Sequence, residues 1–155
     1  MPMDFDPLLR FLHVAGVTVW VGGMFFAYMC LRPSAAELLA PPLRLPLWQR
    51  VFQRFFVWVW VAVILIPVSG LGILLRVGFA GAPVHWHLML ASGFLMIGIF
   101  LYVVTGPYAR LRTAVVAQDW PAAGAALNRI RQAVGSNLLL GLATIGLATL
   151  GRFLA

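Results

Sequence analysis

Four long apolar stretches divide the sequence, and polar residues are concentrated between them. Stretches without Asp, Glu, Lys or Arg run over residues 11–31, 55–75, 77–109 and 132–151. Each is long enough for an α-helix to cross the roughly 30 Å hydrocarbon core of a membrane. The pattern therefore predicts an all-α integral membrane protein, an antiparallel four-helix bundle. We expect its helices over about 7–31, 51–77, 85–112 and 121–152.

Composition leads to the same conclusion. The chain has 155 residues, of which 63% are hydrophobic and 10% charged, so it has too little polar surface to enclose a water-soluble core. The four spans use most of the chain, and we expect one domain over 1–155 with short loops. A Rossmann unit, a P-loop protein and a secreted disulfide scaffold are excluded, because the chain leaves no room for a soluble domain and has one cysteine.

The cationic residues are all arginines, and their placement predicts how the chain crosses the membrane. A formal charge of +7 in a soluble protein would suggest nucleic-acid binding. Here, however, eight of the eleven arginines lie in two connections between spans, so no nucleic-acid partner is expected: Arg32, Arg44, Arg50, Arg54, Arg110, Arg112, Arg129 and Arg131. The positive-inside rule makes those two connections cytoplasmic, and the predicted topology is N-out and C-out.

Local signals predict where the helices begin and end. Arg32-Pro33 is expected to stop the first helix, and the proline-containing connection 33–49 is expected to be irregular, with a short helical turn around 35–39. Before the fourth span, Asp119-Trp120-Pro121 is typical of a helix start, with a capping carboxylate, an interfacial anchor and a first-turn proline.

Three histidines are the only side chains able to supply acid–base or strong ligand chemistry at membrane depth. His13 lies a turn or two below the outer end of the first span, and His85 and His87 lie at the outer end of the third, so all three share one leaflet. No acidic residue occurs inside a span, which argues against a carboxylate proton relay or carboxylate metal site. We therefore consider His13 a candidate cofactor or metal ligand, with a hydrogen-bonded structural histidine as the alternative.

The third span carries a line of soft ligands. At about 100° per residue, His85, Met89, Ser92 and Met96 fall within a narrow arc, whereas His87 points about 200° away from His85. Nitrogen and thioether sulfur are ligands that suit Cu(I), so the arc suggests a copper path. The alternative is that the methionines fill gaps between helices, as methionine commonly does.

Small residues mark two further helix faces. Gly16, Trp20 and Gly23 share a face with His13, which could accept a flat macrocycle with an axial imidazole bond or, equally, a neighbouring helix. On the fourth span a stripe of small and polar residues predicts close helix packing and is one candidate contact face for a homodimer: Asn137, Gly141, Thr144, Ala148 and Gly151.

The first helix resembles a known family signature. Phe11-Leu12-His13 followed by Trp20-Val21-Gly22-Gly23 is similar to the first helix of the copper-resistance protein D (CopD) family, with a histidine seven residues before Trp-x-Gly-Gly. The second helix opens with Arg-Phe-Phe and closes on Ser-Gly, as CopD domains often do. The resemblance implies copper transport or tolerance at the bacterial inner (plasma) membrane. Together with the side chains described above, it makes His13, His85, His87, Met89 and Met96 the candidate metal ligands.

A second family resembles the chain almost as well. Haem-binding protoporphyrinogen oxidases of the HemJ type have a comparable first helix, matched here by His13, Gly16, Trp20, Gly23 and Phe25. Their third helix has a His-x-Lys, where this chain has His87-Leu88-Met89 and no lysine. This resemblance implies an alternative function as a b-type haem protein for electron transfer or porphyrin oxidation, with His13 and His87 as haem ligands.

The expected function is therefore copper handling, with copper as the bound metal and haem b as the alternative cofactor. A non-enzymatic role is favoured, and an enzyme, if it is one, would be a haem-dependent oxidoreductase. Because a four-helix bundle of this size has no obvious continuous pore, we expect a homodimer or a periplasmic copper donor as partner, besides the lipid bilayer.

The arginine distribution makes a direct prediction about topology. Reporter fusions at Gly81 and Ala117 should give opposite signals, the first from the outer face and the second from the cytoplasm, because only Arg76 lies in the connection around Gly81. A paired alkaline phosphatase and fluorescent-protein assay measures this. The reverse pattern would show that the protein is inserted with its histidines in the inner leaflet.

Overall fold

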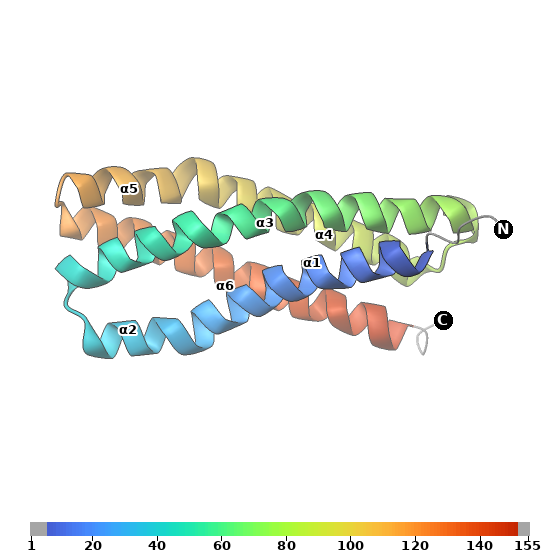
Figure 1. Cartoon of the computed structure of the whole chain (residues 1–155), viewed down its shortest axis with the longest axis horizontal. Helices are drawn as coiled ribbons and strands as arrows, with labels where there is room; N and C mark the ends of the chain where they lie inside the picture. Colours follow the sequence, from blue (N-terminus) through green and yellow to red (C-terminus); the bar gives the residue numbers. More distant parts are fainter. Residues whose placement is uncertain (1–5, 152–155) are drawn as a thin grey trace.

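The chain folds into a bundle of long helices (Figure 1). The computed structural model describes residues 6–151. In chain order the elements are α1 (Asp6–Phe26), the π-helical turn η1 (Ala27–Leu31), α2 (Arg32–Leu38), α3 (Pro41–Val77), the 3₁₀ turn η2 (Phe79–Gly81), α4 (Val84–Val103), the π-helical turn η3 (Val104–Tyr108), α5 (Ala109–Val116) and α6 (Trp120–Leu150). Contiguous elements combine into four helical segments long and apolar enough to cross a membrane, so the predicted all-α membrane fold is confirmed.

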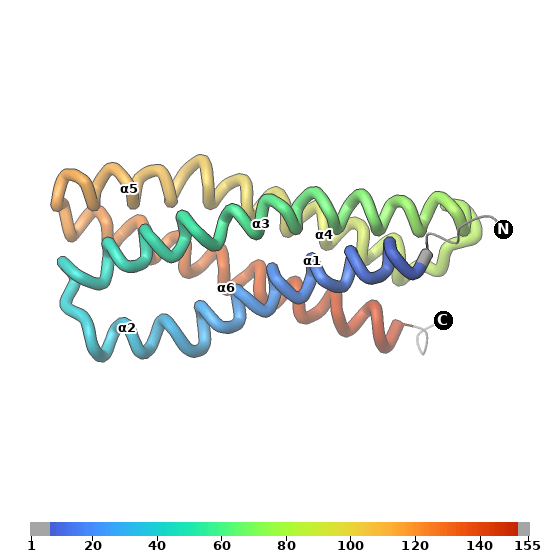
Figure 2. The backbone as a smooth tube through the Cα atoms, viewed as in Figure 1, coloured from blue at the N-terminus to red at the C-terminus, as the bar shows by residue number. Residues whose placement is uncertain are grey.

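The first helix does not stop at Arg32-Pro33, and that prediction is wrong. Helical structure continues from α1 through η1 into α2 and ends at Leu38, as the unbroken tube in Figure 2 shows. In the widened π turn, the N–H of Arg32 donates to the carbonyl of Ala27, five residues earlier. Pro33 follows this widened turn inside the continuous helix, where it has no N–H to donate; a π turn is a local adjustment by which membrane helices accommodate a proline.

The irregular connection expected over 33–49 is reduced to Leu39 and Ala40. The second helix begins at Pro41 instead of near 51, with Pro41 and Pro42 in its first turn and extended backbone at Ala40 before it. Proline is favoured in the first turn because its fixed φ suits a helix, so these prolines begin a helix where local rules suggested a loop. The helix also continues without interruption through Pro67.

The other two connections follow the sequence more closely. The third helical segment spans 84–116 and includes η3, which contains Pro107. Gly78 ends α3 with a φ of 88°, a left-handed conformation that favours glycine. Asp119 caps α6 as predicted, its carboxylate accepting the N–H of Ala122 at 3.0 Å. The predicted end of the fourth helix at 152 lies outside the described residues.

The four helical segments run alternately along the long axis of the molecule. In Figure 1 the start of α1, the α3–α4 connection and the end of α6 lie at one end, and the α2–α3 and α5–α6 connections at the other. The main neighbours are α1 with α3, and α4 with α6. The predicted histidine-bearing segments therefore share one end, and the arginine-rich connections share the opposite end.

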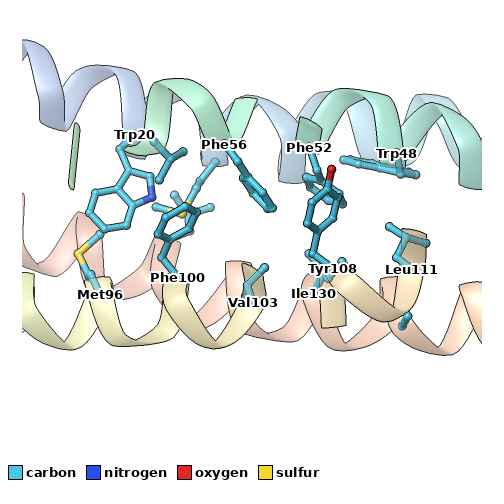
Figure 3. Close-up of a cluster of buried hydrophobic side chains, with 14 of the residues drawn as sticks. Trp20, Trp48, Phe52, Phe56, Met96, Phe100, Val103, Tyr108, Leu111 and Ile130 are labelled. Atoms are coloured by element: carbon cyan, nitrogen blue, oxygen red, sulfur yellow. The ribbon is translucent and has the colours of Figure 1, made fainter. Parts of the chain in front are cut away.

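The core is a column of aromatic rings along the bundle (Figure 3). Trp48, Phe52 and Phe56 follow each other every four residues on α3, with ring centroids 5.2 Å and 5.3 Å apart. Tyr108 of η3 and Phe100 of α4 meet Phe56 edge-on, at 5.0 Å and 5.4 Å. This edge-to-face geometry is the one that aromatic pairs prefer, and it ties the α3 side of the bundle to the α4 side.

The small-residue stripe on α6 packs inside the molecule. The position of a Cβ on Gly141 would lie 2.9 Å from Val21 of α1 and 3.2 Å from Met96 of α4, and one on Gly151 would lie 2.7 Å from His85. The prediction of close helix packing is confirmed. Asn137, Gly141 and Gly151 of the stripe are buried inside the molecule, whereas Ala148 is exposed. Most of the homodimer contact face suggested from the sequence is therefore used within one chain.

This packing predicts different effects for two glycines of the same helix. Gly141→Leu should destabilise the bundle by about 1–3 kcal/mol, because the added side chain meets Val21 and Met96. Gly146→Leu is the matched control, since nothing lies within 4 Å of a Cβ at that position. Thermal unfolding of the two variants in detergent, compared with the wild type, measures the difference. Equal unfolding temperatures for the two would contradict the packing described here.

Candidate functional site

His13 is held by α3. Its Nδ1 atom lies 3.1 Å from the carbonyl oxygen of Ile66 and 3.2 Å from the hydroxyl of Ser69. Ser69 is 1% exposed, and its own hydroxyl donates to the carbonyl oxygens of Leu65 and Ile66. Since a carbonyl can only accept, Nδ1 must carry the proton and donate to Ile66. In its neutral form the imidazole is therefore the Nδ1–H tautomer, and two groups of the neighbouring helix orient it.

This tautomer leaves the other ring nitrogen with a lone pair. Within residues 6–151, the hydrogen bonds of His13 all involve Nδ1, so Nε2 has no polar partner there. Histidines that bind metals usually donate their second ring N–H to a carbonyl or carboxylate, which fixes the tautomer and raises the basicity of the ligating nitrogen. His13 is half-buried, and its Nδ1 has a carbonyl partner of this kind in Ile66.

The other two histidines lie at the same end of the bundle but contact different elements. The ring of His85 packs against Gly151 at the end of α6. The ring of His87 lies 5.7 Å from that of Phe79 in η2. Their opposed directions agree with the helical spacing. In the part of the chain that the structure describes, no three His, Cys, Asp or Glu side chains form a group that could hold a metal ion.

The predicted line of soft ligands on α4 faces α6. The Ser92 hydroxyl lies 2.8 Å from that of Thr144, and it donates to the carbonyl of Met89. Met96 is 5% exposed, and its side chain points toward the indole of Trp20 (Figure 3). The narrow arc deduced from the sequence is therefore one face of α4. This face lies against α6, whereas His13 lies against α3.

The face expected to accept a macrocycle is filled by α3. The position of a Cβ on Gly16 would lie 2.9 Å from Ile66, and one on Gly23 would overlap the ring of Phe55. Trp20 is 3% exposed and meets Phe100 edge-on at 6.1 Å. The glycine notches hold side chains of a neighbouring helix, the alternative that the sequence left open. These residues do not fit a haem between His13 and His87.

A polar side chain without a full set of partners lies deeper in the bundle. Asn137 is 3% exposed; its amide nitrogen donates to the carbonyl of Met96 at 3.3 Å, and its Oδ1 has no hydrogen-bond partner among the described residues. It lines an apolar cavity of about 20 Å³ together with Trp20 and Met24. The other residues that line this cavity are apolar, so Asn137 is a polar side chain in an apolar environment.

Comparison with known proteins identifies the family. The family model described as copper resistance protein D (CopD) matches residues 49–150, which is most of the chain from α3 to the end of α6. The chain belongs to the CopD family. Neither a curated protein nor a solved structure matches it. With four helical segments able to cross a membrane, this CopD protein is a multi-pass protein of the bacterial inner membrane, in contact with the lipid bilayer.

The CopD match covers a different part of the chain from the motif that first suggested the family. The match begins at residue 49, so α1, with His13 and the Trp20-x-Gly-Gly sequence, lies outside it. The matched region does contain His85, His87 and the α3 partners of His13, Ile66 and Ser69. The family assignment therefore stands independently of the His13 motif, and the match gives no support to the HemJ alternative.

Two polar residues in this CopD protein gain importance from the structure. Ser69 was noted only as part of the Ser-Gly that closes the second helix, and Asn137 only as a member of the packing stripe. Both are buried polar side chains inside apolar spans, which is the signal by which they could have been found. Ser69 bonds to carbonyls of its own helix and also to His13, and Asn137 bonds to the Met96 carbonyl. The spacing along one helix gives no information about these two contacts between helices.

Proposed function

We propose that this CopD protein handles copper in transport or tolerance, with His13 as a copper ligand in the outer leaflet. The observation that carries the proposal is the His13 imidazole, whose Nδ1 is engaged by Ile66 and Ser69 of α3 and whose Nε2 lone pair has no partner within residues 6–151. Copper is here the cargo of the protein. The name of the family, copper resistance protein D, agrees with this function.

The chemistry of the available groups favours Cu(I). The spans offer neutral imidazole and thioether and no carboxylate, and such soft ligands prefer Cu(I) to hard cations. A neutral ligand set also leaves the ion's single positive charge as the only charge to be buried, which costs less than burying a divalent ion. His85, His87, Met89 and Met96 are the further candidate ligands for this ion.

We propose that the two methionines serve after His13. They line the face of α4 that packs on α6, with Met96 deeper in the span than Met89. Methionine side chains are flexible, so a thioether in this interface can turn toward an ion that leaves the histidine. With the N-out and C-out topology, copper would meet His13 first from the periplasmic side, from a soluble donor protein or a second copy of the chain.

The proposal predicts that His13 matters more than His85. His13→Ala should weaken Cu(I) binding by more than about tenfold, because it removes the oriented ligand, whereas His85→Ala mainly loses packing against Gly151. Competition with a chromophoric Cu(I) chelator, using protein purified in detergent, measures the affinity, and copper tolerance of cells measures the function.

Ser69→Ala tests the orientation of the imidazole separately. It keeps the ligand and removes one of the groups at its Nδ1, so an affinity loss of about tenfold is expected, smaller than that of His13→Ala. If His13→Ala binds Cu(I) as tightly as the wild type and cells keep normal copper tolerance, His13 is a structural histidine and the proposed site is wrong.

The thioether route predicts an effect of Met89. Met89→Leu nearly conserves side-chain volume, so it should leave the thermal unfolding temperature within a few degrees of the wild type while weakening Cu(I) binding. Leu90→Met is the control. It makes the reverse exchange at the next position, on another face of the same helix, and should leave the Cu(I) affinity unchanged. An unchanged Cu(I) affinity in Met89→Leu would remove the methionine from the path.

A further inference from the structure

A cavity lies at the end of the bundle opposite the histidines. It has a volume of about 370 Å³, within the range of about 300–1,000 Å³ typical of small-molecule sites. Its walls come from η1, α2, the first turns of α3 and the first half of α6. These elements lie together at the end of the molecule that carries the α2–α3 connection (Figure 1). The proposed copper site does not use this cavity.

Three arginines line the cavity, and they differ from the other arginines of the described chain. Arg32, Arg44 and Arg131 are half-buried, whereas the other seven arginines between residues 6 and 151 are exposed. The three come from α2, α3 and α6, so the fold brings together charges from three separate elements. Three like charges gathered at one cavity produce a local positive potential that favours an anion.

The described part of the chain does not supply that anion. Arg32 lies over the ring of Tyr28 at 5.1 Å, and Arg44 reaches the carbonyl of Ala36 at 3.5 Å, but neither these two nor Arg131 forms an ion pair within residues 6–151. The carboxylates of Glu37 and Asp119 are exposed. The cavity therefore has a local charge of +3 without a carboxylate to balance it.

The remaining lining is amphipathic and interfacial. Trp48 and Trp120 line the cavity, and tryptophan is enriched at the level of lipid head groups. Leu45, Phe52 and Val134 add an apolar wall. The 37 residues of α3 measure about 55 Å, longer than the roughly 30 Å hydrocarbon core, so its arginine-containing start extends into the head-group region.

We propose that this cavity binds the head group of an anionic phospholipid. The phosphate would lie among Arg32, Arg44 and Arg131, since guanidinium groups bind phosphate oxygens through paired N–H donors. The apolar wall would receive the upper part of the acyl chains. A lipid fits better than a free phosphate ion, because the cavity also has the apolar wall formed by Leu45, Phe52 and Val134. Basic pockets between membrane helices on the cytoplasmic side commonly hold such head groups.

Native mass spectrometry of the full-length protein in detergent tests this proposal. Delipidated protein is titrated with phosphatidylglycerol and, separately, with zwitterionic phosphatidylcholine, and the affinity for the first bound lipid is compared. Phosphatidylglycerol should bind more tightly. Arg131→Gln should weaken its binding about fivefold, as expected for one arginine near an anionic lipid, and Arg131→Lys should lose less because it keeps the charge.

Arg129→Gln is the matched control, since Arg129 lies on the same helix and is exposed. It should leave the affinity unchanged. If Arg131→Gln does not fold, Arg44→Gln on α3 replaces it, with the exposed Arg50→Gln as its control. Equal losses in variant and control, or equal affinity for the two lipids, would show a diffuse surface charge and overturn the proposal. Competition by inorganic phosphate without lipid preference would assign the cavity to a free anion and overturn it as well.

Discussion

Every backbone N–H and C=O group that crosses the membrane must find its hydrogen bond inside the protein, since hydrocarbon offers none. The helical segments of this chain satisfy that requirement although ten prolines occur in the sequence. Pro41 and Pro42 lie in the first turn of a helix, and the π-helical turns η1 and η3 lie just before Pro33 and around Pro107. The widened turns keep the chain helical, so α1 and α2 form one segment and the bundle extends beyond the hydrocarbon at its arginine-rich end.

The same constraint applies to polar side chains and separates the bundle into regions with different chemistry. At one end the Nδ1–H of His13 donates to the Ile66 carbonyl beside Ser69, and in the middle the Asn137 amide donates to the Met96 carbonyl. At the other end three half-buried arginines converge without a carboxylate. The aromatic column between the ends is continuous and apolar. The candidate ligand for a soft cation therefore lies toward one end of the molecule, and the arginines that could bind an anion lie at the other end.

Spacing along a helix shows which residues share a face, but it does not show which helix packs against that face. Residues on one face of one helix could be grouped from their spacing, and the arc of His85, Ser92 and Met96 does face α6, with Met96 also pointing toward Trp20 of α1. The identity of that neighbour could not be deduced, because the contacting residues lie far apart in the chain. His13 and Ile66 are separated by 53 positions, and the glycines beside His13 were equally compatible with a macrocycle and a helix.

The sequence by itself determined the membrane environment, the four spans, the concentration of arginines in two connections, the Asp119 cap and the close-packing stripe on α6. These features follow from hydrophobicity and from the spacing of residues along a helix, which act locally. Only the tertiary structure decided that α3 fills the notches beside His13, that α4 covers the α6 stripe and that Arg32, Arg44 and Arg131 share one cavity. It also decided that the helices continue through Pro33 and Pro67, because backbone groups in the membrane must stay hydrogen-bonded inside the protein and this outweighs the local tendency of proline to end a helix.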